Sequence, residues 1–147
     1  MELEFSVEGL PPKKDGAQSM WDKPLEVQRL KALRVAALRE MRDPSQFPLD
    51  VPVELHLTVR AHPRDGDLDN FVTGVCDGLM AKHPRASWNR DAWTDVPEDA
   101  APERPLLLRD DALVDRIVAE RMQPQPHGPD YQVRVVTVPT KVPDLTG

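Results

Sequence analysis

The chain has 147 residues, a length that suits one compact domain. Acidic residues outnumber basic ones by 25 to 19, and this formal charge of −6 excludes a uniformly basic nucleic-acid binder, although it leaves room for a local basic stripe beside an acidic site. No apolar run approaches the ~18 residues of a membrane span, and the N-terminus lacks a signal-peptide pattern. We therefore expect a cytoplasmic protein without a membrane partner, in which the single cysteine, Cys76, is a buried small hydrophobe.

The first half of the sequence alternates between strand and helix patterns. Residues 3–7 alternate apolar and polar side chains, which predicts a short strand before the turn at Gly9-Leu-Pro-Pro12. Apolar residues recur at helical spacing over residues 24–42 and predict an amphipathic helix. Residues 51–61 alternate with a period of two and predict a half-buried strand. Helical spacing returns over residues 68–80 and predicts a second helix, whose start can be capped by aspartate or asparagine.

The second half contains an insertion and two further strands. Residues 83–105 are rich in Pro, Ala, Asp and Arg without sustained periodicity, which predicts a long loop or insertion; we expect its tryptophans, Trp88 and Trp93, to pack on the domain, although base stacking is the alternative. Residues 113–122 and 131–138 predict two strands joined by a turn-rich hairpin connection. The sequence thus predicts an α+β domain at 1–138, with a mixed four-stranded sheet and two main helices, and a flexible tail at 139–147.

Carboxylates are concentrated where the strand at 51–61 gives way to the next helix. Asp65, Asp67 and Asp69 alternate there, and crowded carboxylates repel one another unless protons or cations neutralise them. Such hard oxygen ligands favour Mg²⁺, Mn²⁺ or Ca²⁺. An EF-hand calcium loop fits poorly, because Asn70 and Cys76 occupy its glycine and glutamate positions. Solvated turn residues and helix caps remain a second interpretation.

A phosphodiesterase centre is the interpretation that we favour. Asp67 and Asp69 would hold one or two Mg²⁺ ions with help from a distant acid such as Asp111, and the metal would polarise the phosphate and lower the pKa of an attacking water. Asp69, Thr73 and Asp77 are four residues apart and therefore share one helical face. Asp77 would either extend this acidic surface or serve as a hydrogen-bonded structural acid.

The adjacent acids Asp110 and Asp111 form a weaker signal, because such doublets are usually solvated turns. Their position directly before the strand predicted at 113–122 favours a functional role. A carboxylate at that place can be aimed from the edge of a sheet at the start of a neighbouring helix.

The succession of these motifs resembles the RusA-type Holliday junction resolvases over nearly the whole chain. The motifs are Gly9-Leu-Pro-Pro-Lys-Lys14, Asp67-Leu-Asp69-Asn70, Asp77-Gly-Leu79 and Asp110-Asp111-Ala-Leu-Val114, followed by a closing hairpin. The resemblance implies a homodimeric, Mg²⁺-dependent endodeoxyribonuclease, with Mn²⁺ as a substitute metal, that introduces paired nicks into four-way DNA junctions. It also implies that Asp67, Asp69 and Asp111 are the catalytic metal ligands, with Asp77 and Asp110 as supporting acids.

The chain departs from that family at Thr73, where the family commonly carries a lysine that can neutralise charge on the phosphate. Four other cations are candidates for this role and for DNA binding: Lys13, Lys14, Arg64 and Lys82. The insertion at 83–105 is also longer than is usual in the family. Two alternatives therefore stay open, a junction-binding protein with little or no catalytic activity and a small metal-binding interaction domain without a nucleic-acid partner.

Overall fold

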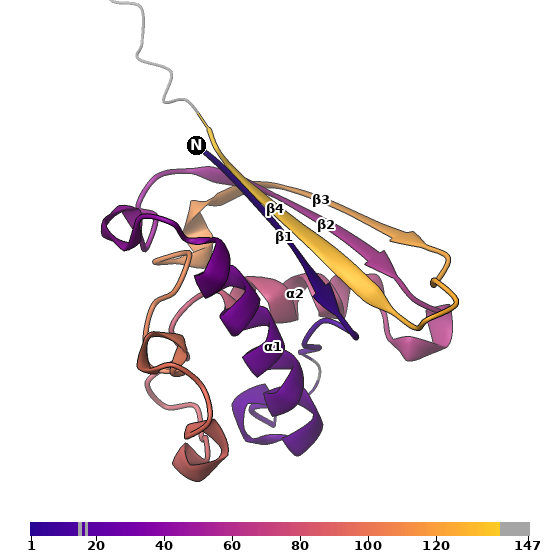
Figure 1. Cartoon of the computed structure of the whole chain (residues 1–147), viewed down its shortest axis with the longest axis horizontal. Helices are drawn as coiled ribbons and strands as arrows, with labels where there is room; N and C mark the ends of the chain where they lie inside the picture. Colours follow the sequence, from indigo (N-terminus) through magenta and orange to yellow (C-terminus); the bar gives the residue numbers. More distant parts are fainter. Residues whose placement is uncertain (15, 17, 139–147) are drawn as a thin grey trace, which may run out of the picture.

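The predicted order of strands and helices is confirmed (Figure 1). The computed structural model describes residues 1–14, 16 and 18–138, and the tail predicted at 139–147 lies outside them. The main elements are β1 (Glu2–Glu8), α1 (Pro24–Glu40), β2 (Val53–Arg60), α2 (Leu68–Gly78), β3 (Val114–Met122) and β4 (Asp130–Thr137). Within the described ranges, neither α1 nor any other helix is long and apolar enough to cross a membrane.

The four strands form one mixed sheet in the order β1-β4-β2-β3. β4 pairs antiparallel with β1 and β2, while β3 pairs in parallel with β2. The predicted hairpin between residues 113–122 and 131–138 is therefore wrong, because β2 separates the two strands. Turn residues between them show that the chain reverses direction, but they carry no information about which strand the returning segment will join.

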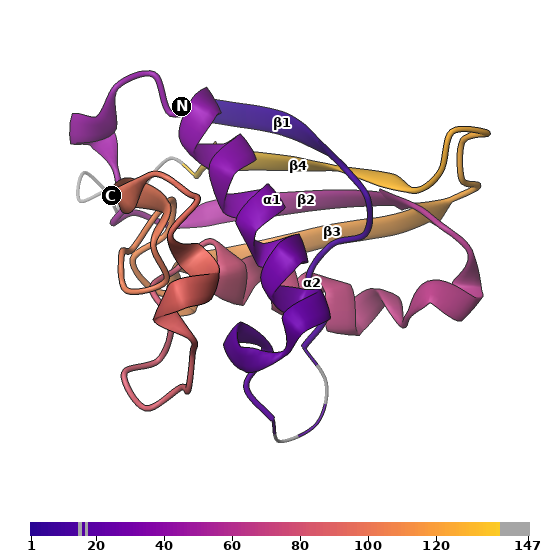
Figure 2. The same ribbon diagram turned by 60° about the horizontal axis from the view of Figure 1, so that its bottom comes forward.

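Both helices cover the same face of the sheet (Figures 1 and 2). The strands turn their apolar positions toward this layer, and every second residue of β2, from Val53 to Val59, is almost fully buried. α2 connects the parallel strands β2 and β3, so it starts beyond the end of β2 and runs back toward the beginning of β3. Residues that precede β3 are therefore expected to meet the end of α2.

The insertion packs beside α1 and adds a second apolar cluster to the core. It contains two short 3₁₀ helices, η4 (Arg90–Trp93) and η5 (Glu98–Ala100). Trp93 is 5% exposed, and its ring centroid lies 5.8 Å from that of Trp21, which precedes α1. The expected packing of Trp93 on the domain is confirmed. Trp88 is partly buried, and the cationic groups of Lys82 and Arg90 lie 5.7 and 5.6 Å from its ring centroid.

A buried arginine on α1 ties the insertion to the end of α2. Arg34 is 0% exposed and donates to backbone carbonyl oxygens at distances of 2.6 to 2.8 Å. Two acceptors, Gly78 and Met80, lie at the end of α2, and the others lie in the insertion at Ala100, Ala101 and Arg104. Burial lowers the pKa of Arg34 to about 10, so the guanidinium still carries its charge at neutral pH.

Candidate active site

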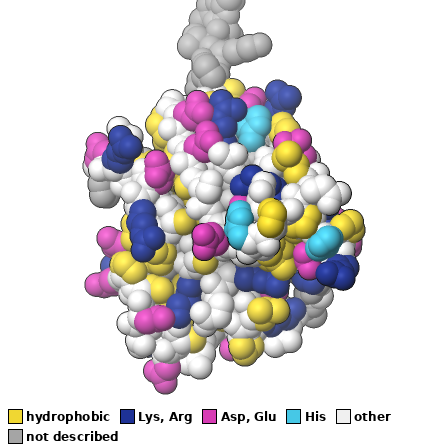
Figure 3. All heavy atoms as spheres, turned by 45° about the vertical axis from the view of Figure 1, so that its right-hand side comes forward, with side chains coloured by type: hydrophobic (Ala, Val, Ile, Leu, Met, Phe, Trp, Pro, Cys, Tyr) yellow, Lys and Arg dark blue, Asp and Glu magenta, His cyan; other side chains and the backbone are white. Residues whose placement is uncertain are grey.

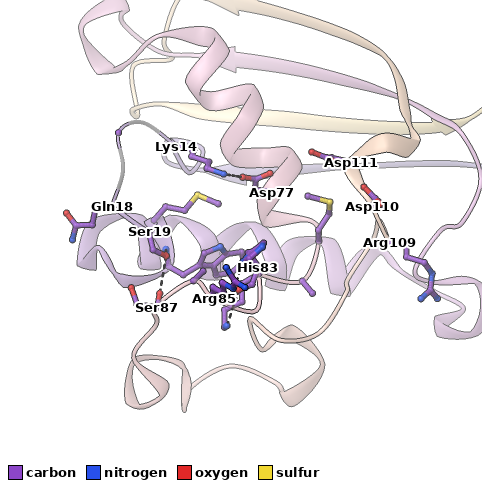
Figure 4. A pocket seen from close by; sticks show the side chains of 17 residues that line it. Lys14, Gln18, Ser19, Asp77, His83, Arg85, Ser87, Arg109, Asp110 and Asp111 are labelled. Atoms are coloured by element: carbon purple, nitrogen blue, oxygen red, sulfur yellow. Dashed lines mark hydrogen bonds and ion pairs between the residues drawn. The ribbon is translucent and has the colours of Figure 1, made fainter.

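A cleft of about 630 Å³ lies where the end of α2, the loop before α1, the start of the insertion and the residues before β3 come together (Figure 4). Three carboxylates line it, those of Asp77, Asp110 and Asp111. Four cationic side chains also line it, those of Lys14, Lys82, Arg85 and Arg109, and His83 lies beside them in the lining. The cleft thus combines carboxylates that can attract a divalent cation with cationic side chains that can attract a phosphate.

The loop that carries Lys14 is fixed from both sides by backbone hydrogen bonds. The N–H of Lys13 donates to the carboxylate of Glu26 on α1 at 2.9 Å, and the N–H of Lys14 donates to the carbonyl oxygen of Asn70 on α2 at 3.2 Å. Glu26 is only 5% exposed. These bonds direct Lys14 to the acidic wall of the cleft, where its Nζ lies 2.7 Å from Asp77 Oδ2.

A glycine on α2 makes this approach possible. A Cβ atom at Gly74 would lie 2.0 Å from the carbonyl oxygen of Pro12, far inside any permitted contact. The backbone of the loop therefore rests directly on the helix, one turn before Asp77. The sequence motif that contains Pro12, Lys13 and Lys14 is in this way connected to the motif that contains Asp77.

Asp110 and Asp111 begin the short 3₁₀ helix η6 (Asp111–Leu113) that leads into β3. The carboxylate of Asp110 accepts the N–H of Ala112 at 3.0 Å, which is the main cause of a lowered Asp110 pKa. The pKa of Asp111 is raised instead, first by its hydrogen bond with Asp110, then by partial burial and by the negative charges of Asp110 and Asp77. In Figure 4, Lys14 reaches Asp77 from one side and Asp111 lies on the other.

The other predicted ligands, Asp67 and Asp69, lie at the start of α2. Together with Thr73 of the same helix and Ala119 of β3 they line a separate, shallow recess. Asp67 occupies the N-cap position of α2 without making a side-chain capping bond, and Asp69 Oδ1 accepts the N–H of Asn70 at 3.0 Å. Both carboxylates are exposed.

The three ligands implied by the resemblance are not gathered at one point. Asp69 and Asp77 are two helical turns apart, about 12 Å along the helix axis, and Asp111 lies with Asp77 at the end of α2. In the described residues no group of three or more Asp, Glu, His or Cys side chains is arranged to hold a metal ion. The expectation that Asp111 points toward a helix start is wrong, because a crossover helix ends where the next parallel strand begins.

Asp65 and Cys76, which flank the predicted ligands in the sequence, have structural roles. Asp65 accepts the N–H of His62 at 3.0 Å and so caps the 3₁₀ helix η3 (Pro63–Asp65). The predicted burial of Cys76 is confirmed, since it is 7% exposed. Burial, with the nearby charges of Asp77 and Asp111, raises the pKa of this thiol to about 11, so it is protonated at neutral pH.

The candidate cations lie in different places. Lys14 and Lys82 line the cleft. Lys13 lies near the start of α2, since its Cδ atom would be 3.0 Å from a Cβ atom added at Gly66. Arg64 is exposed on η3 and is not part of the cleft lining. Residue patterns did not identify Arg85 and Arg109 as site residues, although Arg109 directly precedes the acidic doublet in the sequence.

Comparison with known proteins adds no relative. No protein-family model matches the chain, and no curated protein matches its sequence.

Proposed function

We propose that this protein is a Mg²⁺-dependent, structure-specific endodeoxyribonuclease that nicks four-way DNA junctions in the manner of the RusA-type resolvases and acts as a homodimer. The observation that carries the proposal is the cleft in which Asp77, Asp110 and Asp111 face cationic side chains of three separate segments. Figure 3 shows acidic and basic side chains interspersed over one face of the molecule, without a single extended basic surface. Local cations in the cleft, rather than net charge, would then attract the DNA backbone.

Carboxylate oxygens such as those of the cleft are the ligands that divalent cations of this kind prefer. Such an ion would also relieve the repulsion of Asp111 by Asp110 and Asp77, which raises the pKa of Asp111 after its hydrogen bond with Asp110 and partial burial. Asp111 and Asp77 would hold the ion here, and Asp67 and Asp69 would provide carboxylates further along the same helix. When bound, Mg²⁺ or Mn²⁺ supplies charge stabilisation at the phosphate and lowers the pKa of water.

The protein's own groups would orient the phosphodiester and handle the proton. Lys14, held 2.7 Å from Asp77, can neutralise charge on a non-bridging phosphate oxygen. Asp110, the carboxylate of the cleft that is not assigned to the ion, can accept a proton from the attacking water. The water oxygen bonds to phosphorus as the bond between phosphorus and the leaving oxygen breaks, and the leaving oxygen takes up a proton from solvent.

The proposal is tested with a labelled four-way junction and a linear duplex of the same sequence, each incubated with Mg²⁺, Mn²⁺ or a chelator. We expect metal-dependent, symmetric nicks in the junction alone. Absence of nicking in both metals, with the protein folded, would contradict the enzymatic proposal.

A panel of isosteric variants then identifies the ligands. Asp69→Asn and Asp111→Asn should both abolish nicking if the resemblance transfers its ligand set, whereas Asp77→Asn and Asp111→Asn should do so if the cleft alone holds the metal. Asp99→Asn is the matched control, because Asp99 is exposed on the insertion and outside the cleft lining. Calorimetric titration with Mg²⁺ reports metal binding independently of cleavage.

A second candidate function is junction binding without cleavage, and Thr73 is the observation that favours it. Its hydroxyl donates to the carbonyl oxygen of Asp69 at 3.0 Å, one turn back along the helix, so the side chain is turned toward its own backbone and brings no charge to the acidic recess. Junction-selective binding at low salt, together with absent nicking in both metals, would favour this candidate.

A further inference from the structure

The strand β3 has an open edge with exposed apolar side chains. It is the last strand of the sheet, and within the described residues it pairs only with β2 (Figure 1). Ile117 is 48% exposed, Val118 is 38% exposed and Met122 is 50% exposed. Such an edge presents unpaired backbone N–H and C=O groups to any strand that can approach.

The pairing with β2 shows which way the side chains of β3 point. Ile117 and Ala119 pair with Leu55 and Leu57, whose side chains are buried under the helices. Neighbouring side chains alternate between the faces, so Val118 points to the uncovered face. The middle of β3 therefore offers apolar groups on both faces of the sheet.

The charges of β3 are arranged symmetrically about Val118 with opposite signs. If a second copy of β3 were paired antiparallel with Val118 opposite itself, each charged residue would face one of opposite sign. The opposed pairs would be Ile117 with Ala119, Arg116 with Glu120, Asp115 with Arg121 and Val114 with Met122.

We infer that two copies of this chain associate by antiparallel pairing of β3 about a two-fold axis through Val118. The two four-stranded sheets then continue into one another. Directly opposed side chains of the two strands stay on the same face of the sheet only if one strand slides along the other by an even number of residues. A shift of one such step in either direction sets Arg116 opposite Val118 or Met122, so this register alone matches the charges.

The other edge of the sheet provides a contrast. All charged residues of β1 are glutamates, and pairing two copies about its middle residue, Phe5, would set Glu2 opposite Glu8 of the second copy. Like charges directly opposite one another destabilise a strand pair. β1 is therefore protected against self-association, whereas β3 is complementary to itself.

The pairing would bring the two acidic recesses close to the symmetry axis. Ala119, next to Val118 in the chain, lines the recess that contains Asp67 and Asp69. Ile117 of the second copy would face Ala119 and close the open side of this recess. The inference rests on the homodimer of the proposed function and assigns its interface, and it does not depend on whether the protein cleaves DNA.

Charge exchange tests the register, with dimer dissociation measured by analytical ultracentrifugation over a range of protein concentrations. The pair Arg116 and Glu120 is suitable because the irregularity in the β2 pairing lies before it. Arg116→Glu or Glu120→Arg alone creates two like-charge contacts across the axis and should raise the dimer Kd by about tenfold or more. The double variant restores opposite charges and should return the Kd to within about threefold of the original. Arg104→Glu, exposed on the insertion, is the control.

A cysteine at the axis gives a second readout. Opposed Cα atoms in an antiparallel pair lie about 4.5–5.5 Å apart, within the range of a disulfide, so Val118→Cys should form an intermolecular disulfide under mild oxidation. Gln132→Cys, exposed on the interior strand β4, should not. A monomer at all concentrations, a dimer insensitive to both single reversals, or a double variant as weak as the single ones would overturn the inference. Junction nicking measured in parallel tests the enzymatic part of the proposed function separately, because nicking by a protein without this interface would contradict the inference alone.

Discussion

Asp110 and Asp111 show how two identical neighbouring side chains acquire different properties. Asp110 accepts a backbone N–H and its pKa falls. The pKa of Asp111 rises instead, first because of its hydrogen bond with Asp110 and then because of partial burial and the negative charges of Asp110 and Asp77. A raised pKa for an acid means that the folded protein binds its proton more tightly than the unfolded chain does. The deprotonated form of Asp111 therefore costs stability above the ordinary aspartate pKa.

We predict that Asp111→Asn stabilises the protein at neutral pH, because the uncharged asparagine avoids the cost of a deprotonated Asp111, which arises from its hydrogen bond with Asp110, from partial burial and from repulsion by Asp110 and Asp77. The gain should shrink as the pH falls through the raised pKa of Asp111 and should vanish below the ordinary aspartate value. Thermal unfolding midpoints between pH 3 and 8 measure this, on the range where aspartate titrates. A constant gain at every pH would mean that the charge of Asp111 is not the cause.

Lys14 is predicted to affect activity rather than stability. Its ion pair with Asp77 is half exposed on the lysine side, and such pairs contribute at most about 1 kcal/mol. Lys14→Met should therefore leave the unfolding free energy within about 1 kcal/mol of the original and reduce single-turnover nicking by about tenfold or more.

Thr73→Lys tests whether Lys14 already supplies the positive charge that the resemblance implies at position 73 of α2. If charge at that position limits the rate, the substitution should raise nicking in both the original protein and Lys14→Met. An unchanged rate in the original protein, with rescue of Lys14→Met, would show that Lys14 already supplies the charge.

At the scale of elements, α2 is the part on which the site is built, because one helix carries acids at both ends and receives the Lys14 loop in between. We predict that Gly74→Ala displaces this loop, since the added carbon would meet the carbonyl oxygen of Pro12 at 2.0 Å. Overpacking of this kind costs about 1–3 kcal/mol. The control is Thr73→Ala on the exposed face of the same helix, which should be neutral in chemical denaturation.

The insertion depends on Arg34 in a comparable way. Arg34→Met should leave several buried carbonyl oxygens without donors and lower the unfolding free energy by about 3–5 kcal/mol. Arg34→Lys keeps the charge but lacks the planar fork, so it should rescue only part of this loss. Tryptophan fluorescence would report release of Trp93 from Trp21. An unchanged spectrum in Arg34→Met would show that the apolar cluster alone holds the insertion.

The strands and helices themselves could be predicted from the sequence better than which of them lie side by side in the fold. Strict alternation in β2 and helical spacing in α2 are local signals, and both predictions were confirmed. The position of β4 between β1 and β2, and the contacts of Arg34 with residues 44 to 70 positions away, depend on distant partners. For the same reason the acidic motifs were identified individually, while the grouping of Asp111 with Asp77 required the path of α2.

At the scale of the whole molecule, a net charge of −6 would oppose the attraction between local cations and DNA that the proposed function requires. The cleft contributes four permanent cations per protomer, Lys14, Lys82, Arg85 and Arg109. If each contacts one phosphate, the logarithm of the binding constant should fall with the logarithm of salt concentration with a slope of about −3.6 per protomer.

Fluorescence anisotropy with a junction at several salt concentrations measures this slope. Arg109→Ala should reduce its magnitude by about 0.9, while Arg104→Ala, outside the cleft lining, should not change it. A slope near zero would mean that the cleft does not contact the DNA backbone.

The place of β4 in the sheet has a consequence for the order in which the protein can form during synthesis. β4 is the last of the four described strands to be made, yet it is the only described link between β1 and the rest of the sheet. Until it emerges, β1 has no strand partner and β2 exposes an apolar edge, although β2, α2 and β3 can already assemble as a crossover unit. Folding must then be completed by insertion of a late segment between two early ones, a long-range step that is slow and leaves the nascent chain open to chaperones.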